Sequence, residues 1–178
     1  MQQSLGGPAG LRLAIMRHAK AEGYDKPDLQ RALADRGVRD SEAAGQWFAE
    51  LGLVPDGALV SAAVRTRETW HGVASAAGWT GVPAIFSEPL YGAGPESALD
   101  LIRETPSSVR CLVVVGHNPT MAYIASILDD GSSDLSNEMA TGFPTSAVAV
   151  FDLPADLSTW AELDQASGVL AAYHVPRG

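Results

Sequence analysis

The sequence has little cysteine and no long apolar run. Cys111 is the only cysteine among its 178 residues, so an internal disulfide is excluded and a reducing compartment fits best. No apolar stretch is long enough to cross a bilayer, and the opening "MQQSLGGPAG" lacks the basic and apolar regions of a signal peptide. We therefore expect a cytoplasmic protein, with residues 1–10 as a flexible lead-in to one domain over residues 11–178.

Positive charge is also scarce. Twelve Lys and Arg residues stand against 21 Asp and Glu residues, a net charge of −9. This balance argues against non-specific binding to nucleic acid or to an anionic membrane, because both need a basic surface. We therefore expect neither as a partner. Against this background, Arg17, His18 and Lys20 gather directly after the apolar run at residues 13–16.

Apolar runs predict six β-strands, over residues 11–16, 58–62, 83–87, 111–116, 146–153 and 168–175. The run at 111–116 is continuous and rich in valine, as expected for a strand buried on both faces. Helical spacing of apolar residues appears between these runs, within residues 34–52, 64–78 and 95–104 and from Asn118 onward. We expect Asn118 to cap this last helix, with Pro119 in its first turn.

Strands that alternate with helices predict an α/β fold: a single-domain, three-layer α/β/α sandwich around a mostly parallel sheet. The last two strands have no clear helix between them, so we expect them to pair antiparallel at the sheet edge. Residues 129–144 form the longest weakly patterned stretch, and their role stays open.

Arginine or histidine residues follow three of the predicted strands. Arg17 and His18 follow the first, Arg65 and Arg67 fall in the helical turn after the second, and His117 precedes the helix after the fourth. Ligand sites in open α/β sheets form outside the carboxyl ends of the strands. Guanidinium groups and a helix N-terminus both suit phosphate oxygens, so the pattern indicates a phosphoryl site.

Each of these residues also has a simpler interpretation. A single histidine or arginine at a strand end is more often a solvated loop residue. Arg65 and Arg67, however, oppose the dipole of their helix, so a ligand explains their position better than helix stability does. His71 and His174 have no such neighbours in the pattern, and we interpret both as structural or surface residues.

The motifs "MRHAKAE", "LVSAAVRTRET" and "VVVGHNPT", in this order, resemble the histidine phosphatase superfamily, also called phosphoglycerate mutase-like. The segment "DLQRALADRG" is similar to one in its SixA-type phosphohistidine phosphatase branch. The resemblance covers roughly residues 11–130. The superfamily usually reads Arg-His-Gly where this chain has Ala19 in third place, a variation that fits the branch.

The resemblance implies a phosphoglycerate mutase-like fold and a set of roles. His18 would be the nucleophile that forms a covalent phosphohistidine. Arg17 and Arg65 would hold the phosphoryl oxygens and disfavour the imidazolium form of His18, and His117 would stabilise the transition state. The remaining substrate-binding candidates are Arg31, Lys20 and Asn118. The scheme requires no metal and no cofactor.

Glu88, in "FSEPLYGAG", is the candidate for a general acid. Superfamily members that cleave phosphate esters usually carry a carboxylic acid that protonates the leaving alcohol. The register is ambiguous, because "PLYGAG" can be aligned without Glu88. SixA-type enzymes are thought to manage without this acid, since the N–P bond of a phosphoramidate is labile.

The leading hypothesis is therefore a phosphohistidine phosphatase that acts on a signalling protein. The alternatives are a phosphomonoesterase for a sugar phosphate or nucleotide and a non-catalytic phosphate-binding module. A metallohydrolase is disfavoured because no HxH or HExxH motif occurs, and a serine hydrolase because no G-x-S-x-G motif occurs. The residues leave the physiological substrate and the oligomeric state open, although we favour a monomer.

Overall fold

A single mixed sheet forms the centre of the computed structural model, which describes residues 5–7 and 10–178. Within this part of the chain the strands are β1 (Arg12–Arg17), β2 (Gly57–Ser61), β3 (Ala84–Ser87), β4 (Cys111–Gly116), β5 (Val148–Asp152) and β6 (Val169–His174). Their order is β3-β2-β4-β1-β5-β6. Pairing is parallel from β3 to β1 and antiparallel from β1 through β5 to β6. The predicted parallel sheet with an antiparallel edge is confirmed.

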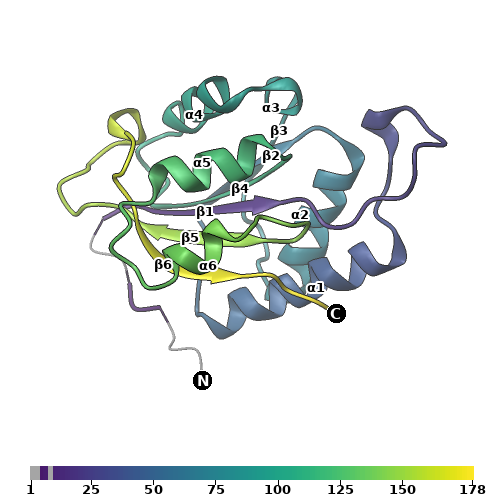
Figure 1. Cartoon of the computed structure of the whole chain (residues 1–178), viewed down its shortest axis with the longest axis horizontal. Helices are drawn as coiled ribbons and strands as arrows, with labels where there is room; N and C mark the ends of the chain where they lie inside the picture. The colour runs from purple at the N-terminus through teal and green to yellow at the C-terminus, as the bar shows by residue number, and fades with distance from the viewer. Residues whose placement is uncertain (1–4, 8–9) are drawn as a thin grey trace.

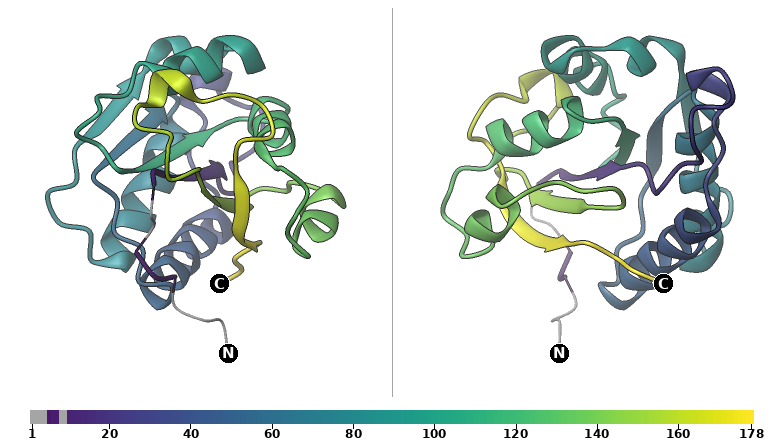
Figure 2. Two further views of the ribbon diagram at one scale, coloured as in Figure 1. Left: turned by 90° about the vertical axis from the view of Figure 1, so that its left-hand side faces the viewer. Right: turned by 45° about the vertical axis from the view of Figure 1, so that its right-hand side comes forward.

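Helices cover both faces of this sheet, which gives the predicted three layers (Figure 1). One face carries α1 (Asp35–Glu50) and α2 (Val64–Ala77). The other carries α3 (Glu88–Gly92), α4 (Pro95–Arg103) and α5 (Thr120–Leu128). Figure 2 shows the same layers from two further directions, with α6 (Ser136–Ala140) beside the antiparallel edge. The short 3₁₀ helices η1 (Asp28–Gln30) and η2 (Trp160–Glu162) lie in the connections.

The central strands contribute side chains to two hydrophobic cores, one on each face of the sheet. Leu13 and Ile15 of β1 pack into the core beneath α4 and α5, whereas Ala14 and Met16 pack into the core beneath α1 and α2. All four are completely buried. A strand covered on both faces needs apolar residues at every position, which explains the continuous apolar runs in the sequence.

The helix around residues 118–128 begins later than predicted. Helix α5 starts at Thr120, with Pro119 just before it, so Asn118 is not the residue that directly precedes the helix. Its side chain still satisfies a backbone donor of the first turn, because Asn118 Oδ1 accepts a hydrogen bond from Ala122 N–H at 3.3 Å. The predicted start of the helix is therefore wrong, but the Asn118 side chain does accept a hydrogen bond from the first turn, as a capping residue would.

Helices α3 and α6 occur where the sequence indicates loops. Each has five residues, too few to show a helical period. Helix α3 has a clear local cause: the Ser87 hydroxyl accepts a hydrogen bond from Leu90 N–H at 3.1 Å, and Pro89 lies in the first turn. Glu88 is thus the first residue of a helix and does not lie in a loop.

The predicted lead-in falls partly outside the described residues, which omit 1–4 and 8–9. Of the others, Leu5 N–H donates to the Leu51 carbonyl at 2.9 Å, and the Gly6 carbonyl accepts from Arg12 Nη2 at 3.0 Å. In the part of the chain that the structure describes, none of the helices has the length and apolar character needed to cross a membrane.

The topology brings three functional segments together. Strand β4 lies between β2 and β1, so the carboxyl ends of all three parallel strands meet at one edge of the sheet. Arg17 is paired with Gly116 across β1 and β4. The residues after these strands therefore start from neighbouring positions, as expected for a ligand site in an open α/β sheet.

Candidate active site

The backbone around His18 is held on both sides. His18 N–H donates to the Gly116 carbonyl at 3.0 Å, and the His18 carbonyl accepts from Ser146 N–H at 3.1 Å. Ala19 N–H then donates to the Thr69 hydroxyl at 3.0 Å. These bonds join β1, β4 and α2 at one point, so the chain direction after β1 is fixed. The His18 side chain is largely buried there.

The His18 imidazole has a defined tautomer. Its Nδ1 lies 2.7 Å from the carbonyl oxygen of Ala19. A carbonyl can only accept a hydrogen bond, so Nδ1 carries the proton and Nε2 keeps its lone pair. Burial, together with the charges of nearby arginines, lowers the pKa of His18 to about 4. The ring is therefore neutral at physiological pH, with a nucleophilic nitrogen at Nε2.

His117 is a second neutral imidazole, with its ring centroid 5.3 Å from that of His18. Arg65 Nη2 lies 3.2 Å from His117 Nδ1, and a guanidinium group can only donate, so Nδ1 accepts. The proton is then on Nε2, which lies 2.7 Å from the Ser61 hydroxyl. Burial, followed by the neighbouring His18 and Arg65, lowers the pKa of His117 to about 3.

Three arginines surround the two imidazoles. Arg31 and Arg65 are buried, and the charges of Arg17, Arg31 and Arg65 all act on His18. Arg17 Nη1 donates to the Phe143 carbonyl at 3.2 Å. Nε of Arg17 and Nε of Arg65 are buried and have no hydrogen-bond partner among the described residues. Buried donors of this kind suit an anionic ligand.

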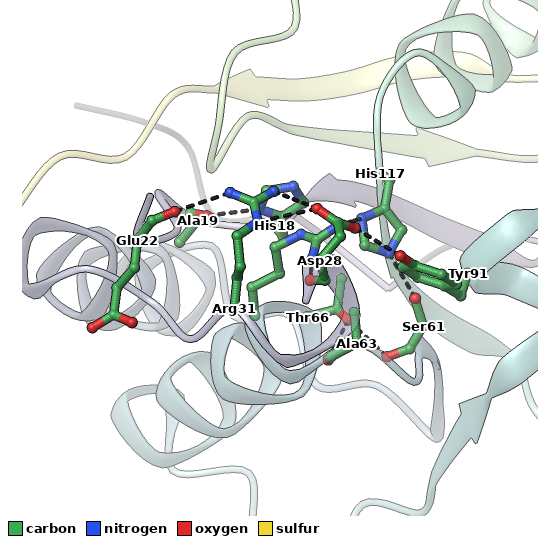
Figure 3. Close-up of polar contacts among 11 residues, drawn as sticks. His18, Ala19, Glu22, Asp28, Arg31, Ser61, Ala63, Thr66, Tyr91 and His117 are labelled. Carbon is green, nitrogen blue, oxygen red and sulfur yellow. Dashed lines mark hydrogen bonds and ion pairs between the residues drawn. The ribbon is translucent and has the colours of Figure 1, made fainter. Parts of the chain in front are cut away.

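One carboxylate, that of Asp28 on η1, binds two of these arginines (Figure 3). Its Oδ1 accepts from Arg31 Nη2 at 2.7 Å, and its Oδ2 accepts from Arg65 Nη2 at 3.0 Å and from the Tyr91 hydroxyl at 2.7 Å. The Tyr91 hydrogen bond, followed by those from the arginines, holds the pKa of Asp28 well below its usual range. The site thus contains three guanidinium groups and one ionised carboxylate, which binds two of them. The excess of positive charge suits a phosphoryl dianion.

No family model matches the chain. A protein from Mycobacterium tuberculosis H37Rv, itself uncharacterised, is 34% identical over 168 residues, which cover 91% of this chain and 100% of the relative. A solved structure from Nakamurella multipartitia, described as a candidate phosphohistidine phosphatase SixA, is 30% identical with a TM-score of 0.80 and covers 96% of this chain and 99% of its own. A second such structure, from Agrobacterium tumefaciens, is 28% identical with a TM-score of 0.76 over 94% and 99% of the two chains.

The chain belongs to the SixA branch of the histidine phosphatase superfamily. SixA family membership makes the protein a hydrolase and a phosphatase, which confirms the expectation of an enzyme. It also confirms the phosphoglycerate mutase-like fold.

Five of the residues predicted for a SixA-type site come together in the structure: Arg17, His18, Arg31, Arg65 and His117. Two others do not contact this group. Lys20 and Glu88 are exposed, and neither side chain forms a hydrogen bond or ion pair with the rest of the described chain.

Arg67 also stays outside the group of five. Its guanidinium lies 5.0 Å from the centre of the Phe86 ring, on the exposed side of α2. The contact with Phe86 accounts for its place at the helix N-terminus without a ligand. A ligand is therefore not needed to explain the position of Arg67, and for Arg65 the ligand explanation stays a prediction.

Both polar side-chain atoms of Asn118 form hydrogen bonds within the protein. Its Nδ2 donates to the Phe143 carbonyl at 2.7 Å, and its Oδ1 accepts from Ala122 N–H. The same carbonyl accepts from Arg17. The end of the 129–144 segment, whose role the sequence leaves open, thus fixes one arginine of the site through Phe143.

The sequence reasoning missed four polar residues of this site: Asp28, Ser61, Thr69 and Tyr91. Signals for two of them were present. Ser61 stands at the carboxyl end of a predicted strand, and Asp28 stands three residues before Arg31 in the segment that resembles the SixA branch. Tyr91 carries no such signal, because its partner Asp28 is 63 residues away.

Proposed function

We propose that the protein is a phosphohistidine phosphatase that acts on a phosphohistidine-bearing signalling protein through a covalent intermediate on His18. The orientation of His18 is the observation that carries the proposal. Its Nδ1–H is bound to the Ala19 carbonyl, so Nε2 keeps its lone pair, and the charges of three arginines act on the ring. A neutral imidazole beside three guanidinium groups is suited to attack an anionic phosphoryl group.

The reaction has two steps. The lone pair of His18 Nε2 forms a bond to phosphorus while the P–N bond of the substrate breaks, and the leaving imidazole keeps the bonding electrons and takes a proton from solvent. Water then attacks phosphorus and releases one proton to solvent, and the bond to His18 breaks with its electron pair returning to Nε2. Arg17, Arg31 and Arg65 hold the phosphoryl oxygens in both steps, and His117 supplies a hydrogen bond as charge builds on them.

The surroundings of the site favour a phosphoramidate over a phosphate ester. An alkoxide leaving group needs a proton donor, whereas an imidazole leaves more readily. Asp28, the carboxyl group that contacts the site arginines, is ionised and has no proton to give. Glu88 is exposed on α3 and has no polar partner in the described chain to hold it over the phosphate.

A substrate panel with Glu88→Gln tests this proposal. We expect the wild-type protein to hydrolyse a phosphohistidine peptide and p-nitrophenyl phosphate much faster than glucose 6-phosphate, because only the sugar alkoxide needs an acid. Glu88→Gln should leave the rate on the phosphohistidine peptide within about twofold, since Glu88 has no partner in the site. Initial rates on all three substrates, with His18→Ala as the inactive control, are the measurement.

The opposite pattern supports the small-molecule phosphomonoesterase. In that case glucose 6-phosphate would be hydrolysed efficiently, and Glu88→Gln would lower that rate by about 10²–10⁴-fold, the usual contribution of a general acid. That result would contradict the proposed substrate class while leaving the nucleophile in place.

A further inference from the structure

Asp28 connects three segments that are distant in the sequence. Arg31 donates to Oδ1 from both Nε and Nη2, at 3.0 and 2.7 Å. Arg65 donates from Nη1 to the Asp28 backbone carbonyl at 2.7 Å and from Nη2 to Oδ2. Tyr91 donates to Oδ2 from α3. A single residue thus fixes two of the three guanidinium groups of the site.

The hydrogen bonds that hold Arg65 to Asp28 also affect His117. With Nη1 and Nη2 both bound to Asp28, one edge of the Arg65 guanidinium is fixed, and the same Nη2 donates to His117 Nδ1. That bond determines which nitrogen of His117 carries the proton. The buried Nε of Arg65, which has no partner among the described residues, is left as a donor for a ligand. Asp28 therefore orients His117 through Arg65.

The charge of Asp28 has a second consequence. Its side chain is 44% exposed, so ions from solvent can approach it. The carboxylate is ionised, and it competes with a phosphate ion for the donors of Arg31 and Arg65. It also repels a dianion bound next to it. Both effects weaken the binding of free phosphate, the product of the reaction.

We propose that Asp28 is a positioning residue that aligns Arg65 and His117 for the transition state and lowers the affinity of the site for free phosphate. The inference rests on the proposed function and adds to it. Because catalysis depends on binding the transition state better than the ground state, a residue that orients donors while weakening product binding favours turnover. Asp28 acts through other residues and takes no part in bond making.

Phosphate binding and turnover, measured separately, test this proposal. The dissociation constant of inorganic phosphate comes from calorimetry and kcat from p-nitrophenyl phosphate. We expect Asp28→Asn to lower kcat at least about tenfold while it tightens phosphate binding by about three- to tenfold, because a negative charge beside the anion is removed. A residue that only supports the fold would weaken binding and kcat together.

Two further variants separate charge from geometry. Asp28→Glu keeps the charge but lengthens the side chain, so phosphate affinity should stay within about twofold of wild type while kcat falls. This variant also tests the proposal if Asp28→Asn does not fold. Asp25→Asn is the matched control: it removes a charge from the same exposed segment, at a carboxylate without a polar partner in the described chain, and should change neither value.

Asp28→Asn with weaker phosphate binding, or with binding and kcat both at the wild-type level, overturns the inference. A wild-type protein that binds phosphate but hydrolyses neither the phosphohistidine peptide nor p-nitrophenyl phosphate contradicts the proposed function instead. The effect of Asp28 on phosphate affinity is then still decided by the calorimetry.

Discussion

His18 and His117 are the same residue type at equivalent strand ends, yet their protons lie on opposite ring nitrogens. The Ala19 carbonyl takes the Nδ1–H of His18, which leaves Nε2 as its unprotonated nitrogen. Arg65 donates to Nδ1 of His117, which leaves the proton on Nε2. The proposed nucleophile and its neighbour are therefore distinguished by their hydrogen-bond partners. Strand-end positions are visible in the sequence, but such partners are not, because they depend on side-chain orientation.

Asn118 offers a test at the residue scale, because its two polar atoms join the Phe143 carbonyl to the first turn of α5. We expect Asn118→Ala to lower the free energy of unfolding by about 1–2 kcal/mol, since two partly buried hydrogen bonds are lost. Urea denaturation is the measurement. Lys20→Ala is the control and should leave stability unchanged, because the exposed Lys20 ammonium has no partner in the described residues. Equal effects of the two substitutions would contradict the structural role of Asn118.

At the scale of elements, the sequence predicts whatever is long enough to show a period. The strands and the helices α1, α2 and α4 lie within a few residues of their predicted bounds. Helices α3 and α6 are too short to do so, and α3 depends on one capping bond from Ser87. The sequence therefore predicts a loop at Tyr91, which the structure places in α3. Of the four site residues that the sequence did not indicate, only Tyr91 lies on this short helix, whereas Asp28, Ser61 and Thr69 lie on η1, β2 and α2.

The contact between α1 and α2 depends on a glycine. A Cβ atom added to Gly45 would meet the Val73 carbonyl oxygen and would lie 2.7 Å from the Ala76 methyl group. Gly45→Ala should therefore lower the free energy of unfolding by about 1–3 kcal/mol, despite the higher helix propensity of alanine. Thermal or urea denaturation measures this.

Gly92→Ala is the matched control for that substitution. Gly92 also lies in a helix, but an added Cβ would meet nothing within 4 Å. Stability should stay the same or rise by up to about 1 kcal/mol. A stabilising effect of Gly45→Ala would show that the two helices pack less closely than the structure indicates.

For the whole molecule, the buried imidazoles predict how stability depends on pH. The pKa of His18 is lowered to about 4 in the folded protein, against about 6.5 in the unfolded chain. Below pH 6.5 the unfolded chain binds a proton that the folded protein does not, so stability falls as the pH drops from 6.5 toward 4. The neighbouring His117, with a pKa lowered to about 3, acts in the same direction. We expect His18 alone to lower the free energy of unfolding by about 2 kcal/mol between pH 7 and pH 5.

Urea denaturation of the wild type and His18→Gln at both pH values measures this contribution. The variant lacks the titrating group, so its stability should fall by about 2 kcal/mol less than that of the wild type over the same range. Parallel pH profiles for the two proteins would show that His18 is not buried as a neutral imidazole.

The covalent intermediate on His18 is the central claim, and trapping the phosphoryl group tests it most directly. The wild type is mixed with a ³²P-labelled phosphohistidine peptide, quenched in base, digested and analysed by mass spectrometry, with folded His18→Ala in parallel. We predict an acid-labile, base-stable label on His18 in the wild type. We also predict no label in His18→Ala and a loss of turnover of at least about 10³-fold, because the nucleophile has no substitute. Label on another residue, or near-wild-type turnover by folded His18→Ala, would contradict the account.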